Sequence, residues 1–66
     1  MKITLNGEEQ TLENQVTIET LLKENGYNGK LVAVAINNEF APKTSYATTT
    51  INDGDAIEIV APMQGG

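Results

Sequence analysis

The chain has 66 residues, with four Lys or Arg, nine Asp or Glu and a formal net charge of −5. It contains no Cys and no His, which excludes a disulfide, a thiol nucleophile and the commonest metal ligand. The acidic balance disfavours nucleic acid and anionic membrane surfaces as partners, and no apolar run approaches the ~20 residues of a membrane span. We therefore expect one small domain, monomeric when free and cytoplasmic.

The N-terminal segment is typical of a β-hairpin. Ile3 and Leu5 alternate with polar residues, as in a half-buried strand. Asn6-Gly7 follows, and these two residue types best tolerate the positive φ angles of a type I′ turn. A return strand at about 8–12 has the charged composition of a sheet edge.

A short helix is predicted at about 18–25. Thr17 can cap its N terminus. Gly26 suits the left-handed position that ends a helix, which would let Tyr27 pack back against the last turn. One apolar stripe is formed by Ile18, Leu21 and Leu22. So short a helix must dock against a sheet to be stable.

The continuous apolar run at 31–36 (LVAVAI) predicts an internal strand. Asn37-Asn38 is a second candidate for a two-residue turn, and it leads to a short strand at 39–40. Pro42 ends that strand or places it at an edge.

The last part of the chain predicts one more strand. Residues 43–50 are polar and irregular, with Tyr46 as a packing anchor, and 52–55 form a turn. The strand at 56–60 (AIEIV) follows, with alternate residues facing the core. Helix and strands must bury their apolar sides on each other, which indicates an α+β fold with one helix on one face of a mixed sheet.

Side-chain candidates for catalysis or metal binding are weak. Asp53 and Asp55 flank Gly54, but Asp-Gly is a turn dipeptide and a metal site usually has more ligands. Glu8 and Glu9 are neighbours on a strand and point to opposite faces. We therefore predict no catalytic residue, no metal site and no bound cofactor in this chain.

The C-terminal segment is the best candidate for a functional site. We expect residues 1–61 to form the folded domain and 62–66 a flexible tail, in which Pro62 stiffens the base. Gly65 and Gly66 lack a Cβ atom, so that a narrow channel of a partner can close around the backbone. The tail would deliver its α-carboxylate to another protein's active site, where transfer of AMP from ATP and attack by a sulfur nucleophile give a thiocarboxylate. The alternative is a frayed terminus.

Several segments together resemble the ThiS family, the ubiquitin-like sulfur carriers of thiamine thiazole synthesis. The resemblance covers the whole chain and rests on Asn6-Gly7, VAVAIN at 32–37, Glu39 to Pro42 and, above all, the ending DGDAIEIVAPMQGG at 53–66. Asn37-Asn38 and Lys43 stand where the family often has Asn-Gly and Arg. The resemblance implies a β-grasp fold with sheet order 2-1-5-3-4 and the helix across one face.

The resemblance also implies a set of partners. A ThiF-type adenylating enzyme would activate Gly66 with ATP and magnesium, and a cysteine desulfurase relay would supply the sulfur. The thiocarboxylate would pass its sulfur to a ThiG-type thiazole synthase. The chain would then be a protein co-substrate and not an enzyme. Gly65 maps onto the glycine that threads the partner's channel, together with the preceding tail residues Pro62, Met63 and Gln64.

Apolar residues close to the tail have reason to be partly exposed, which predicts a partner surface at Phe40, Val60 and Met63. Three alternatives to a ThiS-like carrier stay open at this point. The first is a MoaD-like carrier for molybdopterin synthesis, and the second is a modifier that joins Gly66 to a target lysine. The third is a non-covalent β-grasp interaction module with an inert tail.

Overall fold

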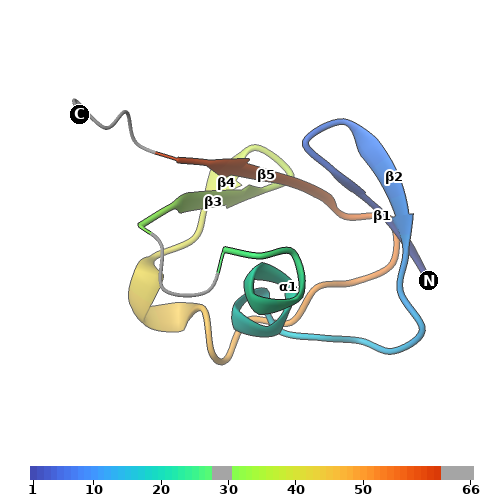
Figure 1. The fold of residues 1–66 in the computed structure, drawn as a ribbon, viewed down its shortest axis with the longest axis horizontal. Helices are drawn as coiled ribbons and strands as arrows, with labels where there is room; N and C mark the ends of the chain where they lie inside the picture. Colours follow the sequence, from blue (N-terminus) through green and yellow to red (C-terminus); the bar gives the residue numbers. More distant parts are fainter. Residues whose placement is uncertain (28–30, 62–66) are drawn as a thin grey trace.

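In the computed structural model, which describes residues 1–27 and 31–61, one helix lies against one face of a five-stranded sheet (Figure 1). The strands are β1 (Lys2–Leu5), β2 (Glu8–Thr11), β3 (Ala33–Ile36), β4 (Glu39–Phe40) and β5 (Ala56–Val60). Helix α1 spans Ile18–Glu24, and a 3₁₀ turn, η1, spans Lys43–Ser45. The sheet order is β2-β1-β5-β3-β4, with β1 and β5 parallel and the other pairs antiparallel. The predicted α+β fold and strand order are confirmed.

Both predicted two-residue turns are present. Asn6 and Gly7 have φ angles of 52° and 85°, and Asn37 and Asn38 have 52° and 71°. Positive φ at both positions defines the type I′ geometry whose twist matches that of the flanking strands. These local signals therefore set the registers of β1 with β2 and of β3 with β4.

Local signals also determine the ends of α1. The Thr17 side chain accepts a hydrogen bond from the backbone N–H of Thr20 at 3.2 Å. At the other end Gly26 has a φ of +86°, and the N–H of Tyr27 donates to the Leu22 carbonyl at 2.8 Å. This is the Schellman arrangement, in which a left-handed glycine satisfies the last carbonyls. The helix ends one residue before its predicted end.

The core lies between α1 and the sheet. Tyr46 is buried, and its hydroxyl donates to the Val32 carbonyl at 3.3 Å, which confirms its role as an anchor. Ile51 is completely buried, although the sequence did not predict it as a core residue. The buried core cluster comprises Ile3, Leu5, Ile18, Leu21, Leu22, Val34, Tyr46, Ile51, Ile57 and Ile59.

The return strand ends at Thr11, one residue before its predicted end, and two further segments also differ from the prediction. β3 is internal, as predicted, but begins at Ala33 and not at Leu31. Ala33 pairs with Val60, the last residue of β5, so the preceding residues have no strand partner there. The segment predicted as irregular contains η1, in which the Ser45 N–H donates to the Pro42 carbonyl at 2.9 Å.

Candidate functional site

The middle strand, β5, leads towards the predicted tail. β1 pairs with it only as far as Ile57, whereas β3 pairs with it as far as Val60. The Asn6 side chain continues on the β1 side, because its Oδ1 accepts a hydrogen bond from the Ile59 N–H at 2.8 Å. β5 is thus held on both sides to within one residue of its end.

Large apolar side chains are exposed on β4, at the end of β5 and just before β3. Phe40 is 70% exposed and Val60 53%, so the structure places both predicted surface residues in the open. Phe40 and Glu58 are the cross-strand neighbours of Ala35, which is buried between them although it faces away from the helix. Leu31 is 68% exposed as well. Sequence reasoning placed Leu31 in a strand and missed its exposure.

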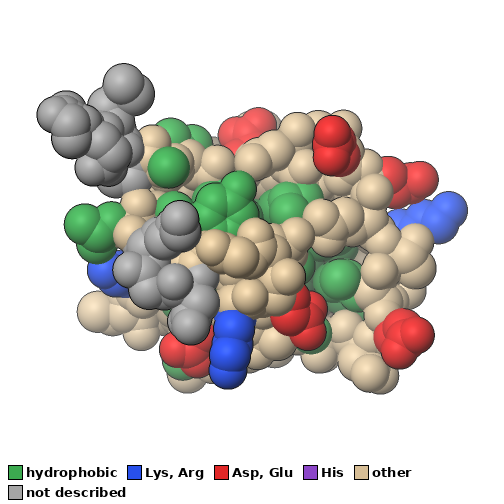
Figure 2. Space-filling model, in the orientation of Figure 1, with side chains coloured by type: hydrophobic (Ala, Val, Ile, Leu, Met, Phe, Trp, Pro, Cys, Tyr) green, Lys and Arg blue, Asp and Glu red, His purple; other side chains and the backbone are tan. Residues whose placement is uncertain are grey.

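The acidic side chains are the next candidates for a functional site. Asp and Glu side chains are scattered over the face shown in Figure 2 and form no single cluster there. Within the described residues, no group of three or more acidic side chains is placed to hold a metal ion. On this face the described acidic groups are therefore dispersed.

The acidic turn at 52–55 has a structural role, as predicted. Asp53 Oδ1 accepts from the Lys2 N–H at 2.6 Å. Asp55 Oδ2 accepts from the Asn52 N–H at 2.8 Å, and its Oδ1 accepts from Asn37 Nδ2 at 3.1 Å. Both carboxylates are therefore engaged in holding the turn before β5.

In the described part of the chain no helix is long and apolar enough to cross a membrane.

A model of the ThiS family matches residues 3–66. The chain belongs to the ThiS family. The sulfur carrier protein ThiS of Thermus thermophilus is 41% identical to it over 64 residues, which are 97% of this chain and 98% of that one. A thiazole synthase of Paramagnetospirillum magneticum is 48% identical over 66 residues. This chain spans only 20% of the length of that relative.

Two solved structures have the same fold. The crystal structure of ThiS from Geobacter metallireducens aligns with a TM-score of 0.86 and 30% identity over 100% of both chains. An NMR structure of a thiamine biosynthesis protein from the same organism aligns with a TM-score of 0.81 and 30% identity, over 100% of this chain and 88% of that one. The β-grasp prediction is therefore confirmed.

The structure locates only part of the predicted ThiS site. Phe40 and Val60 lie among the described residues. The predicted tail residues lie outside the described residues: Pro62, Met63, Gln64, Gly65 and Gly66. Sequence reasoning also missed the contact of Asn6 with β5. The sequence signal for this contact is the Asn at the left-handed turn position, because its side-chain oxygen can accept a hydrogen bond from the neighbouring strand.

Proposed function

We propose that this chain is a sulfur carrier protein of thiamine biosynthesis, a protein co-substrate and not an enzyme. The observation that carries the proposal is the ThiS family match, which runs through the Gly65-Gly66 ending. Similarity to a sulfur carrier over nearly the whole of both chains supports it. In this proposal residues 1–61 form the recognition domain and residues 62–66 the reactive tail. In this proposal the chain acts in the cytoplasm, where ATP is available.

The reaction takes place at the Gly66 carboxylate. A carboxylate is a poor electrophile, so a ThiF-type enzyme with ATP and magnesium must activate it first. A carboxylate oxygen bonds to the α-phosphorus of ATP, and pyrophosphate leaves. A persulfide, which a cysteine desulfurase relay would supply, then attacks the carbonyl carbon with its outer sulfur, and AMP leaves. A thiol must next cleave the S–S bond of the resulting acyl disulfide, which releases the thiocarboxylate and leaves a disulfide on the relay protein. The result is one carboxylate oxygen replaced by sulfur.

The chain's own residues present the tail. The hydrogen bond from Ile59 to Asn6 supports a firm base for it, because it fixes β5 next to its last residue. The exposed side chains of Phe40 and Val60 support a docking surface beside that base, which Met63 would extend. Gly65 would pass through the enzyme's channel, since it has no side chain to obstruct it.

The acceptor of the sulfur is a thiazole synthase of the ThiG type. A relative named thiazole synthase contains a segment similar to this whole chain in one fifth of its length. A carrier-like segment in the same polypeptide as a thiazole synthase supports direct transfer between the two.

Intact mass spectrometry tests the proposal. The chain is incubated with a ThiF-type enzyme, ATP, magnesium and a sulfur donor, with the enzyme shown to be active on another carrier. We expect a mass gain equal to the exchange of one oxygen for one sulfur. It should be absent without ATP and absent in a variant that lacks Gly66. An unchanged mass in the complete mixture would overturn the proposal.

A further inference from the structure

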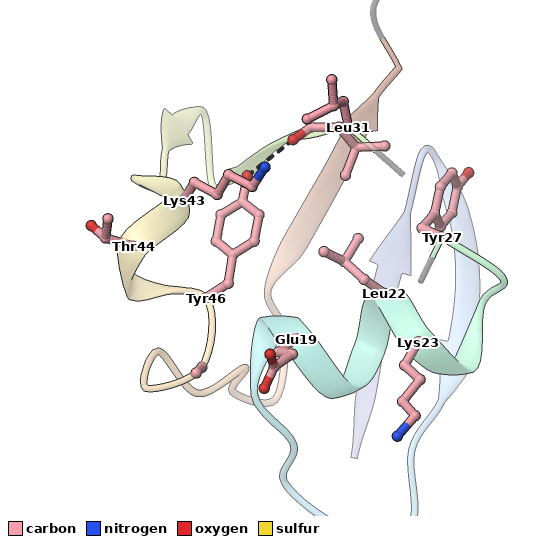
Figure 3. Close-up of a pocket in the computed structure, with 10 residues that line it drawn as sticks. Glu19, Leu22, Lys23, Tyr27, Leu31, Lys43, Thr44 and Tyr46 are labelled. Carbon is pink, nitrogen blue, oxygen red and sulfur yellow. Dashed lines mark hydrogen bonds between the residues drawn. The ribbon is translucent and has the colours of Figure 1, made fainter. Parts of the chain in front are cut away.

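A groove of about 350 Å³ lies between α1, η1 and the segment that leads into β3 (Figure 3). Leu22 and Tyr46 line it and are only 8% and 9% exposed. Tyr27, after the C-terminal end of the helix, and Leu31, before β3, complete the lining on the side away from η1. Sites for small molecules usually measure about 300–1,000 Å³, so the groove has room for one large side chain of a partner.

The Lys43 end of this groove carries a positive charge on a chain whose net charge is −5. The charged lining residues are Lys23, Lys43 and Glu19. In Figure 3 the Lys43 ammonium group and the Glu19 carboxylate lie at opposite ends of the groove, whereas the Lys23 ammonium group points away from it. A carboxylate that approaches Lys43 is therefore attracted, whereas one that approaches acidic side chains elsewhere on the surface is repelled.

The groove is continuous with the apolar surface at the end of β5. A second hollow is lined by Leu31, Val32, Ala33, Lys43 and Val60. It shares Leu31, Val32 and Lys43 with the groove. A protein docked beside Val60 therefore lies next to the groove, with Lys43 in the lining of both hollows.

We propose that the groove binds an acidic segment of the adenylating partner that carries an aromatic side chain. The ring packs against Leu22 and Tyr46, and a neighbouring carboxylate pairs with Lys43. This inference rests on the proposed function, since it assigns a second contact to the enzyme that activates the tail. A second copy of this chain is the poorer occupant, because two molecules of charge −5 repel each other. A local reversal of charge sets the orientation in which a partner docks.

A peptide titration tests the chemistry of the groove without the enzyme. The ¹⁵N-labelled chain is titrated with N-acetyl-Glu-Phe-Glu-amide and, separately, with N-acetyl-Lys-Phe-Lys-amide. We expect saturable shifts of the Tyr27, Leu31 and Ala47 amides with the acidic peptide, at a Kd of about 1 mM. The net charge alone predicts the opposite preference. Equal or tighter binding of the lysine peptide at these amides, or no localised shifts, would overturn the proposal.

Enzyme kinetics then test the occupant. In pyrophosphate release by the ThiF-type enzyme, Lys43→Glu should raise KM about three- to tenfold and leave kcat unchanged, because reversing a rim charge removes one attraction and adds a repulsion. Lys2→Glu is the matched control, since it makes the same charge change on β1, and its KM should stay within about twofold. An unchanged KM for Lys43→Glu, or an equal rise for Lys2→Glu, would overturn the assignment to this enzyme. If the unaltered chain is not activated, the proposed function fails, and the peptide titration still decides what the groove binds.

Discussion

Asn6 and Asn37 hold opposite sides of β5 in the same way. Both have a φ of 52°, and their N–H groups donate to the carbonyls of Ile57 and Ala56, each at 2.8 Å. Their side-chain oxygens accept from the N–H groups of Ile59 and Ala56, at 2.8 and 3.0 Å. Two turn residues thus extend the ladders on both sides of β5, one near its end and one at its start. The strand that precedes the predicted tail is therefore fixed at both ends.

The Asn6 contact predicts a local loss of stability in Asn6→Gly. Glycine keeps the positive φ but leaves the Ile59 N–H without its acceptor, which should lower the free energy of unfolding by about 1 kcal/mol. Urea unfolding gives the stability, and hydrogen exchange of the Ile59 amide, which should quicken, gives the location. Asn6→Asp is the control, because aspartate keeps an acceptor oxygen and tolerates this turn position. Unchanged exchange at Ile59 in Asn6→Gly would refute the role of the side chain.

Ile51 predicts a large loss when its side chain is shortened. It is completely buried, so Ile51→Ala should destabilise the chain by about 2–5 kcal/mol and Ile51→Val by about 0.5–1.5 kcal/mol. Thermal or urea unfolding measures both. Leu31→Ala is the control, because a side chain that is 68% exposed should change stability by no more than about 0.5 kcal/mol. Similar losses for Ile51→Ala and Leu31→Ala would contradict this burial.

Much of the fold could be predicted because its signals are local. Asn-Gly and Asn-Asn determine two turns, and Thr17 and Gly26 determine the ends of α1. Ile51 was missed because the residues before it are polar and show no period. A contact distant in sequence places it: its N–H donates to the Val16 carbonyl at 2.8 Å. Together with the bridge between Thr17 and Thr50, that bond holds the segment beside the start of α1, where Ile51 joins the core.

Some parts of the candidate site could likewise be predicted from the sequence, and other parts could not. The glycines of the tail and the apolar character of Phe40 and Val60 can be read in the sequence directly. The contact of Asn6 with Ile59 joins residues 53 positions apart and depends on the sheet order. The groove beside Lys43 is assembled from three separate segments, none of which is unusual by itself. Sites of that kind appear only when the elements have been placed.

The helix cap predicts a moderate loss in Thr17→Ala. The Thr17 side chain accepts from the Thr20 N–H, and removal of such a cap usually costs about 0.5–2 kcal/mol. Thr17→Ser keeps the hydroxyl and should lose much less. Urea unfolding of the two variants side by side measures the difference. Equal stability of the two variants would show that the hydroxyl does not stabilise the helix.

The exposed surface predicts a defect in partner binding in the double variant Phe40→Ser, Val60→Ser. Both side chains are exposed, so the fold should persist, as circular dichroism can verify. KM for the ThiF-type enzyme should rise about tenfold or more, the effect of losing contacts worth at least ~1.4 kcal/mol. Thr4→Ala is the control, since Thr4 is exposed and pairs with Ala56 at the opposite end of β5. A KM unchanged by the double substitution would remove this surface from the docking site.

The tail predicts a steric block in Gly65→Val. A β-branched side chain should not enter a channel that closes around bare backbone, so thiocarboxylate formation should fall below detection in the intact mass. Thermal unfolding should match that of the unaltered chain, which separates this effect from misfolding. Gly65→Ala is the graded control and should react more slowly than the unaltered chain but faster than Gly65→Val. Normal thiocarboxylate formation by Gly65→Val would show that the partner's channel is wide at this position, and Gly65 would lose its proposed role.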